Sequence, residues 1–445
     1  MRENTLAAPS APESAPAAAD AVRPPTRIPL WLILLIATFL LLIGASKGFG
    51  LPEVDVVEYQ CYARAFWGGP SAVAAAHLNA CPVYLGTLPA APFVALPREY
   101  GPLALVPFSL PALAPAALYP WLFAVEMLIV IYGVTALLRR FGAPGAAHAW
   151  LFYAMLGSMA TAAGRFDVVP SACVVCAVVA LRQDRQKLAY VALAAGVLLK
   201  LYPLLLLPLF LIHTWRSRQG KPTWRAPATF AGVVAAVVGL AALLNPSRVL
   251  DPLRFMGSRC VQVESLPATV SYLWARLTGG GVSYSYSYNA TCQQSPGLDA
   301  LATLCTLIAL AGIALVAYLF WRGRISLVLA MILTLCLAMV GTKVFSPQYL
   351  LWVSPLVALE YGLNVRAFLA WGAICLATTL CYPLSYGSLL LVPLHATPQQ
   401  LVPITAALRN LLLAALVVYV LTHYWRGKAA RAGAADLGAG DEVTP

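Results

Sequence analysis

Two carboxylates follow the first apolar segment at a spacing that suits acid–base chemistry. Asp55 and Glu58 are three positions apart, so in a helix their side chains would share one face. A carboxylate held at a membrane surface can act as a general base that takes the proton from a substrate hydroxyl. Acidic residues also serve simply to solvate a polar loop, so these two residues alone leave both interpretations open.

Three further charged residues interrupt apolar sequence. Arg165 and Asp167 belong to the short run Gly-Arg-Phe-Asp, and Lys200 lies inside a long apolar stretch. Charge close to lipid is costly and often marks a functional site, and a cation there can bind a phosphate group. The alternatives are that Arg165 and Asp167 neutralise each other, and that Lys200 extends to the membrane interface.

Polar side chains in the other loops are candidate substrate ligands. Glu99 and Tyr100 precede a proline-rich run, where the tyrosine could instead be an interface anchor. Pro347 begins another candidate segment, although proline is also common at the first position of a helix. The remaining candidates are Arg259, Gln262, Glu264, Lys343, Gln348 and Tyr349.

Several signatures of other enzyme classes are missing from the sequence. It contains no G-x-x-x-x-G-K phosphate loop and no H-E-x-x-H motif, and its 5 histidines are scattered. These absences argue against an ATP-driven pump and a zinc protease. We expect no metal site.

The composition is that of a membrane protein. Of 445 residues, 61% are hydrophobic and only 10% are charged, whereas soluble domains carry about 25% charged residues. Membrane-spanning segments must be helices or closed barrels, and the long Leu/Ala/Val-rich runs lack the alternation of barrel strands. We therefore predict an all-α, polytopic transmembrane bundle of about 11–13 helices, with extracytoplasmic loops forming the active-site face.

The net charge of +12 does not indicate a nucleic-acid partner. Lys and Arg sit mainly in short loops beside apolar runs, as the positive-inside rule describes. If these loops lie on the cytoplasmic side of the cell membrane, both termini are also in the cytoplasm. The predicted spans are 29–45, 119–138, 146–162, 168–182, 188–199, 201–213, 228–244, 301–320, 325–342, 348–361, 366–382 and 402–424.

This topology divides the chain into three parts. Residues 1–27 are predicted to be a disordered cytoplasmic tail, 28–425 a transmembrane domain, and 426–445 a second cytoplasmic tail. Within the domain, 46–118 and 245–300 are the long external loops, and the Ser/Tyr-rich stretch 283–292 is predicted to be a flexible cap.

Two segments are ambiguous. Residues 102–118 are apolar but broken by prolines, and we predict an interfacial or re-entrant segment instead of a span. Residues 188–213 are long enough for one tilted span, but basic loops flank both ends. Because Pro203 disfavours helical geometry in the residue before it, we predict two short helices with a turn near Lys200.

The cysteines fall into two groups. Six lie in or beside apolar runs and should behave as small hydrophobes. Cys61 and Cys81 share the first external loop, and Cys260 and Cys292 share the second. Two pairs on an oxidising face suggest two disulfides.

Six segments, in this order, resemble the integral-membrane glycosyltransferases of the C superfamily, specifically glycosyltransferase family 87 and the related DUF2029 group. They are D-V-V-E-Y at 55–59, E-Y-G-P-L at 99–103, G-R-F-D at 164–167, A-G-V-L-L-K-L-Y-P at 195–203, R-C-V-Q-V-E-S-L at 259–266 and F-S-P-Q-Y-L-L-W at 345–352.

The resemblance implies a polyprenyl-phosphate-linked monosaccharide donor, commonly mannose, used on the outer face, and a lipid or glycan acceptor. Asp55 matches the family's carboxylate and would deprotonate the acceptor hydroxyl, with inversion at C1 of the sugar. Four cations become candidates for holding the departing phosphate: Arg165, Lys200, Arg259 and Lys343. No cofactor is expected beyond the lipid-linked donor.

A polytopic transporter or lipid-sugar flippase is the rival interpretation. Transporters place ionisable groups near the bilayer midplane and often contain inverted repeats. Here the acidic residues cluster at the outer ends of predicted helices, and no repeat is evident. A membrane subunit without chemistry would have nearly the same composition.

Overall fold

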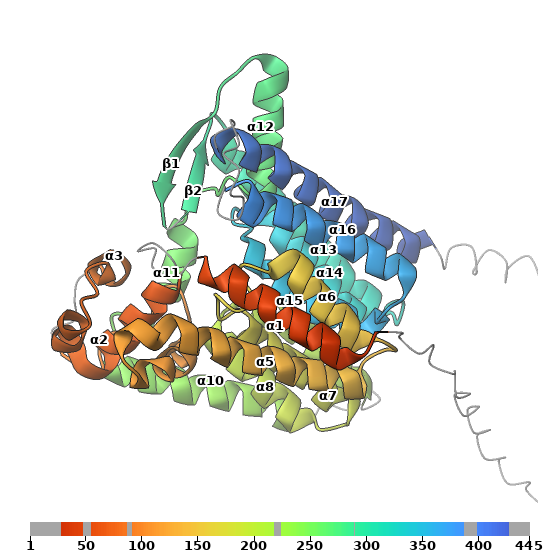
Figure 1. Ribbon diagram of the computed structural model, residues 1–445. Helices are drawn as coiled ribbons and strands as arrows, with labels where there is room; N and C mark the ends of the chain where they lie inside the picture. Colours follow the sequence, from red (N-terminus) through yellow and green to blue (C-terminus); the bar gives the residue numbers. More distant parts are fainter. Residues whose placement is uncertain are drawn as a thin grey trace, which may run out of the picture.

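A computed structural model of the protein describes residues 28–47, 55–86, 91–217, 224–288, 290–386 and 398–426. The predicted tails lie outside these ranges, apart from Arg426, which ends the last helix. The described residues form a bundle of long helices with smaller elements gathered at one end (Figure 1).

Within the described ranges, twelve α-helices overlap the predicted spans. They are α1 (Leu30–Ser46), α5 (Tyr119–Phe141), α6 (Ala146–Ser158), α7 (Val168–Arg182), α8 (Gln186–Leu199), α9 (Leu207–Ser217), α10 (Arg225–Leu244), α13 (Leu298–Trp321), α14 (Leu327–Gly341), α15 (Leu350–Tyr361), α16 (Val365–Thr379) and α17 (Pro398–Arg426).

The lengths and apolar character of these helices confirm an all-α polytopic membrane fold. In the described residues, five helical segments are long and apolar enough to cross a bilayer: 116–141, 225–244, 298–321, 365–384 and 401–426. Four shorter apolar helices accompany them, namely α1, α7, α8 and α14. Lipid satisfies no backbone hydrogen bond, so each spanning segment must be helical.

The first long loop folds into short helices. It contains α2 (Asp55–Ala75), α3 (Cys81–Leu85), η1 (Pro102–Ala104), α4 (Leu105–Ser109), η2 (Pro111–Leu113) and η3 (Ala116–Leu118). Gly69, with φ of 63°, kinks α2 before Pro70. The stretch 102–118 is broken as expected, and Val106, Leu110 and Leu113 on it are exposed, which suits a membrane interface.

The second long loop is more ordered than the sequence suggested. It forms α11 (Asp251–Ser258), α12 (Leu266–Thr278) and two antiparallel strands, β1 (Ser283–Ser287) and β2 (Ala290–Gln294). The expectation of a flexible cap at 283–292 was therefore wrong for the described residues. Alternating Ser and Tyr has the two-residue period of a strand.

The chain breaks near Lys200, as predicted. Helix α8 ends at Leu199, and η4 (Tyr202–Leu206) leads into α9. Two other short turns shape the same region, η5 (Pro347–Tyr349) before α15 and the π-helical turn η6 (Leu380–Leu384) after α16. These interruptions break the α-helical backbone where polar side chains gather.

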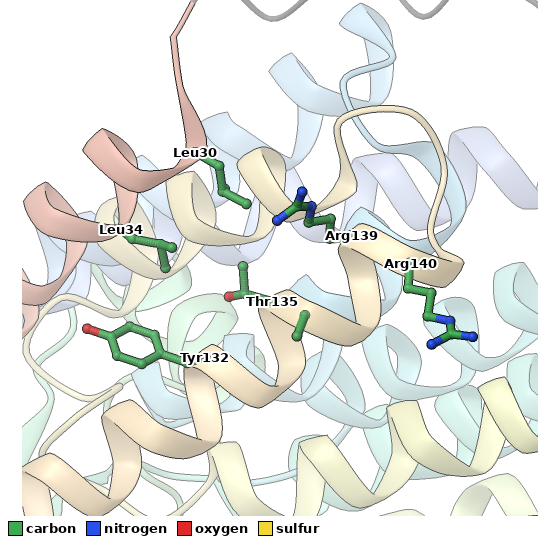
Figure 2. A pocket seen from close by; sticks show the side chains of 7 residues that line it. Leu30, Leu34, Tyr132, Thr135, Arg139 and Arg140 are labelled. Atoms are coloured by element: carbon green, nitrogen blue, oxygen red, sulfur yellow. The ribbon is translucent and has the colours of Figure 1, made fainter.

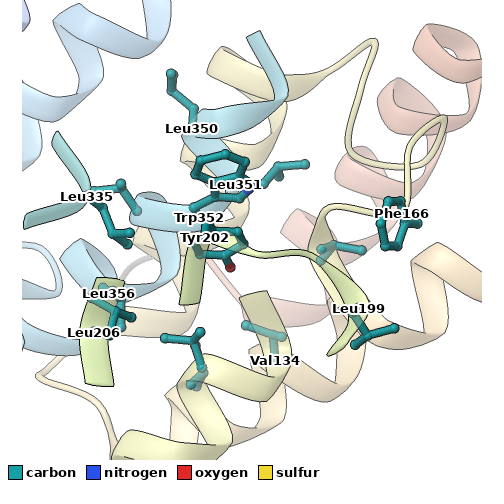
Figure 3. Packing of buried hydrophobic residues seen from close by; sticks show 14 of the residues in the cluster. Val134, Phe166, Leu199, Tyr202, Leu206, Leu335, Leu350, Leu351, Trp352 and Leu356 are labelled. Carbon is teal, nitrogen blue, oxygen red and sulfur yellow. The ribbon is translucent and has the colours of Figure 1, made fainter. Parts of the chain in front are cut away.

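The small elements and the chain ends lie at opposite ends of the bundle. Helix α1 begins and α17 ends at one end, whereas α2, α3, α11 and the hairpin lie at the other (Figure 1). Beneath the latter end, Tyr202 and Trp352 stack among buried Leu199, Leu206 and Leu356 (Figure 3). This packing gives the loops a rigid base.

Candidate functional site

Asp55 and Arg165 form an ion pair between the first loop and the turn after α6. Arg165 Nε lies 2.8 Å from Asp55 Oδ2, and the two side chains are 21% and 18% exposed. Asp55 is the first residue of α2, where the positive end of the helix dipole favours a carboxylate. The alternative that Arg165 neutralises Asp167 was wrong, because each residue has a different partner.

Asp167 pairs with Lys200. Lys200 Nζ lies 2.7 Å from Asp167 Oδ1, and the Trp352 indole N–H donates to the same oxygen at 2.7 Å. The Asp167 side chain is 1% exposed, and its other oxygen accepts no hydrogen bond from any described residue. A buried carboxylate of this kind depends on its cation.

Aromatic rings surround the Lys200 ammonium group. Nζ lies 5.4–5.7 Å from the centroids of four rings, those of Tyr100, Phe166, Tyr349 and Trp352. Tyr349 stacks on Trp352 at 3.8 Å, and Trp352 on Tyr202 at 4.1 Å. Lys200 is therefore fixed by one carboxylate and by cation–π contacts.

Two glutamates beside this pair carry raised pKa values. Glu58 is 2% exposed, and burial, followed by the charges of Glu99 and Asp55, raises its pKa well above the usual value. Burial raises the pKa of Glu99 to about 7, with repulsion from Asp55 acting in the same direction and Arg259 opposing it. These carboxyl groups share one electrostatic environment, in which protons are retained.

Arg259 lies beside this cluster and has no carboxylate partner among the described residues. Its Nη2 approaches the Tyr288 carbonyl oxygen at 3.5 Å, and its guanidinium lies over the Phe255 ring at 5.5 Å. No described acidic residue lies within ion-pair distance, and Nε is buried without an acceptor among the described residues. Arg259 therefore retains hydrogen-bonding capacity for a ligand.

The other predicted ligands join the loops 259–265 and 343–349. The backbone N–H of Gln262 donates to the Lys343 carbonyl oxygen at 2.9 Å, and Lys343 Nζ donates to the Gly257 carbonyl oxygen at 2.8 Å. Gln348 is buried, and its Oε1 accepts no hydrogen bond from the described residues. These contacts hold the two loops in a fixed relationship beside Arg259.

Sequence reasoning missed the residues that hold Glu264. Arg409 of α17 is fully buried and donates to the carbonyl oxygens of Glu264 at 2.6 Å and Phe345 at 3.2 Å. The Glu264 carboxylate accepts from Tyr386 at 2.7 Å and lies 3.8 Å from Arg409 Nη1. An arginine inside predicted span 402–424 was the available signal, since buried intramembrane charge is costly.

Disulfides join both predicted cysteine pairs. Cys61 bonds to Cys81, which ties α2 to α3, and Cys260 bonds to Cys292, which ties the residue after Arg259 to β2. Both bonds brace segments that carry candidate site residues. The described residues contain no group of three or more His, Cys, Asp or Glu side chains arranged to hold a metal ion.

More than half of the chain matches the model of a known protein family. The model of glycosyltransferase family 87 matches residues 99–347, more than half of the chain. The matched range includes Glu99, Arg165, Lys200 and Arg259, whereas Asp55 precedes it and Arg409 follows it. No curated protein matches the chain.

Proposed function

The chain belongs to glycosyltransferase family 87 and is therefore a multi-pass membrane enzyme that transfers a sugar; from this premise we propose that its donor is a polyprenyl-phosphate-linked hexose. The proposed sugar is mannose-like, and the acceptor is a lipid or glycan of the cell envelope. The observation that carries the proposal is the gathering of Asp55, Glu58, Glu99 and Arg259 at the loop end of the bundle.

In the proposed reaction Asp55 is the general base. The acceptor hydroxyl oxygen attacks C1 of the sugar while Asp55 takes its proton, and the bond from C1 to the phosphate oxygen breaks with inversion at C1. Polyprenyl phosphate leaves with the electron pair. The ion pair with Arg165 supports this role, because it orients Asp55 as a carboxylate, the form that a base requires.

Arg259 is the proposed ligand of the departing phosphate. Arg165 and Lys200 each contact a carboxylate, and Lys343 contacts a backbone carbonyl. Arg259 has a buried Nε without an acceptor among the described residues. A guanidinium aimed at developing negative charge stabilises the transition state more than the ground state, so Arg259 fits the task best of the four cations.

Glu58 and Gln348 are proposed to bind sugar hydroxyls. Oε1 of each side chain is buried and accepts no hydrogen bond from the described residues. A buried polar atom without a partner is costly unless a ligand supplies one. Sugar hydroxyl groups are suitable donors. Tyr100 and Tyr349, whose rings lie beside the Lys200 ammonium group, would then border the sugar.

The proposed orientation places the site outside the cell membrane and both termini in the cytoplasm. Arg139, Arg182 and Arg216 lie in the last turns of α5, α7 and α9, at the inner ends that the positive-inside rule assigns. The beginning of α1 and the end of α17 share one end of the bundle, opposite α2 and α11 (Figure 1). Cysteine labelling from outside intact cells tests this orientation: an introduced cysteine at Ser258 should react, and one at Arg322 should not.

The donor class is tested with purified protein in nanodiscs. Radiolabelled mannose is offered on polyprenyl phosphate or on a nucleotide, together with a cell-envelope lipid extract and with or without a chelator. Transfer from the polyprenyl donor alone supports the proposal, and transfer that a chelator leaves unchanged supports independence of metal ions. Transfer from the nucleotide donor alone contradicts the proposal.

A further inference from the structure

A second candidate binding site lies at the opposite end of the bundle from Asp55. A pocket of about 420 Å³ lies between α1 and α5 and is lined by Leu30, Leu34, Ala136 and Arg139, among others (Figure 2). A neighbouring pocket of about 790 Å³ shares Leu30, Leu34 and Arg139 and continues over the start of α6. Together they form one groove, here called the α1–α5 groove.

The α1–α5 groove has an apolar floor and a basic rim. Leu30, Leu34 and Ala136 supply the apolar surface, and the hydroxyl groups of Thr38 and Tyr132 hydrogen-bond to each other between the two helices. Arg139 lies in the last turn of α5. The site therefore suits a molecule with an apolar chain and a negatively charged head.

Arg139 is available to such a molecule. Its guanidinium makes no hydrogen bond, ion pair or ring contact with any described residue. It points across the groove toward Leu30, whereas Arg140 points away (Figure 2). An unpaired guanidinium at the end of a membrane helix is a ready ligand for phosphate.

The groove opens where lipid must lie. Around it the outward side chains are apolar and exposed, including Trp31 (65%) and Leu35 (62%) on α1 and Ile129 (64%) on α5. Such surface is stable only against acyl chains. Basic pockets between membrane helices bind anionic lipid headgroups because a cation and an apolar surface lie side by side.

We propose that the α1–α5 groove binds one anionic phospholipid from the leaflet at that end of the bundle. Its phosphate is held by Arg139, and one acyl chain lies along Leu30, Leu34 and Ala136. A lipid in this position braces α1 against α5. Because α1 precedes Asp55 in the chain, the lipid would steady the helix that leads to the reaction site.

The test is native mass spectrometry of the delipidated full-length protein. It is titrated with phosphatidylglycerol or with phosphatidylcholine of the same acyl chains, and inorganic phosphate serves as the free anion. We expect phosphatidylglycerol to bind at least about tenfold more tightly than phosphatidylcholine, because the choline cation of the latter offsets the attraction of its phosphate group for Arg139.

Three variants locate the binding. Arg139→Gln should remove the preference for phosphatidylglycerol, and Ala136→Phe, which fills the apolar part, should weaken binding of that lipid. Arg322→Gln removes an exposed arginine at the end of α13, outside the groove. It should change neither the preference for phosphatidylglycerol nor the affinity for that lipid. Ala136 is an exposed position, so the added ring need not disturb the fold.

Three results would overturn the proposal. They are equal binding of both lipids by the wild type, unchanged phosphatidylglycerol binding by Arg139→Gln, and competition by inorganic phosphate combined with normal lipid binding by Ala136→Phe. The last result would indicate a free-anion site.

Discussion

Asp55 and Arg165 meet at 2.8 Å although one begins α2 and the other lies in the turn after α6. Two residues further along that turn, Asp167 contacts Lys200 at 2.7 Å. The same short turn therefore holds the first loop on one side and the break between α8 and η4 on the other. This turn therefore connects the proposed base, Asp55, to Lys200.

Lys200→Met should destabilise the protein by about 3 kcal/mol, because it leaves the buried Asp167 carboxylate without its cation. The double variant Lys200→Met/Asp167→Asn should recover most of this loss, since the remaining groups are neutral. Chemical unfolding in detergent, followed by tryptophan fluorescence, measures both. A Lys200→Met protein as stable as the wild type would show that the pair is not structurally important.

Arg259→Gln should lower kcat/KM for the donor by about 10²-fold, the size expected when a transition-state hydrogen-bond donor is removed. Lys343→Gln is the matched control, because its ammonium group already contacts the Gly257 carbonyl, and it should cost less than about fivefold. Steady-state kinetics compares the two. The reverse order of effects would assign the phosphate to Lys343.

The pH dependence of donor binding should follow Glu99. With its pKa raised to about 7, mainly by burial, Glu99 becomes negative as pH rises through 7, and this charge repels the donor phosphate and partly offsets the charge of the nearby Arg259. Donor KM should therefore rise above about pH 7, whereas KM of Glu99→Gln should stay flat. A wild-type KM that is constant from pH 6 to about pH 8 would contradict this role.

The same shift affects folding stability. Between the usual value of 4.5 and about 7, the folded protein keeps a proton on Glu99 that the unfolded chain has released. The stabilisation that comes from this bound proton is therefore fully present below pH 4.5, the pKa in the unfolded chain, and is lost as pH rises through about 7, the pKa in the folded protein. Glu99→Gln should remove this part of the pH dependence of the unfolding free energy, and an unchanged dependence would contradict it.

Arg409→Met should destabilise the protein by about 3–5 kcal/mol and lower kcat, because it leaves the buried Glu264 carboxylate without its cation and removes one donor each from the carbonyl oxygens of Glu264 and Phe345. Arg426→Met changes an exposed arginine at the end of the same helix and should have little effect. Unfolding and transfer assays on the pair measure both. Equal unfolding free energies and equal kcat values for the two variants would exclude a positioning role for Arg409.

The sequence predicted much of the fold because lipid imposes a simple rule. Long apolar runs such as 301–320 and 402–424 must become helices, and Pro203 marked the break after α8. The β1–β2 pairing was missed, because the Ser/Tyr alternation at 283–287 was interpreted as part of a flexible cap instead of as a strand period.

The candidate site was less predictable. The residue types at Asp55, Arg165, Asp167 and Lys200 were identified, but their pairing was not, since a contact between distant segments depends on how helices pack. Arg409 was not among the candidates, although it lies inside predicted span 402–424. Because charge in lipid is energetically costly, an arginine in a membrane span indicates a buried side chain with polar partners, as Arg409 proves to be.

Whether Asp55 is the general base is decided by sugar transfer in Asp55→Asn, measured with polyprenyl-phosphate-linked radiolabelled mannose in nanodiscs beside the wild type. Asp251→Asn is the control, because Asp251 is also an ion-paired aspartate at a helix start, in α11. All three proteins should bind the donor, and only the wild type and Asp251→Asn should transfer the sugar. Full transfer by Asp55→Asn would contradict the role of Asp55 as general base.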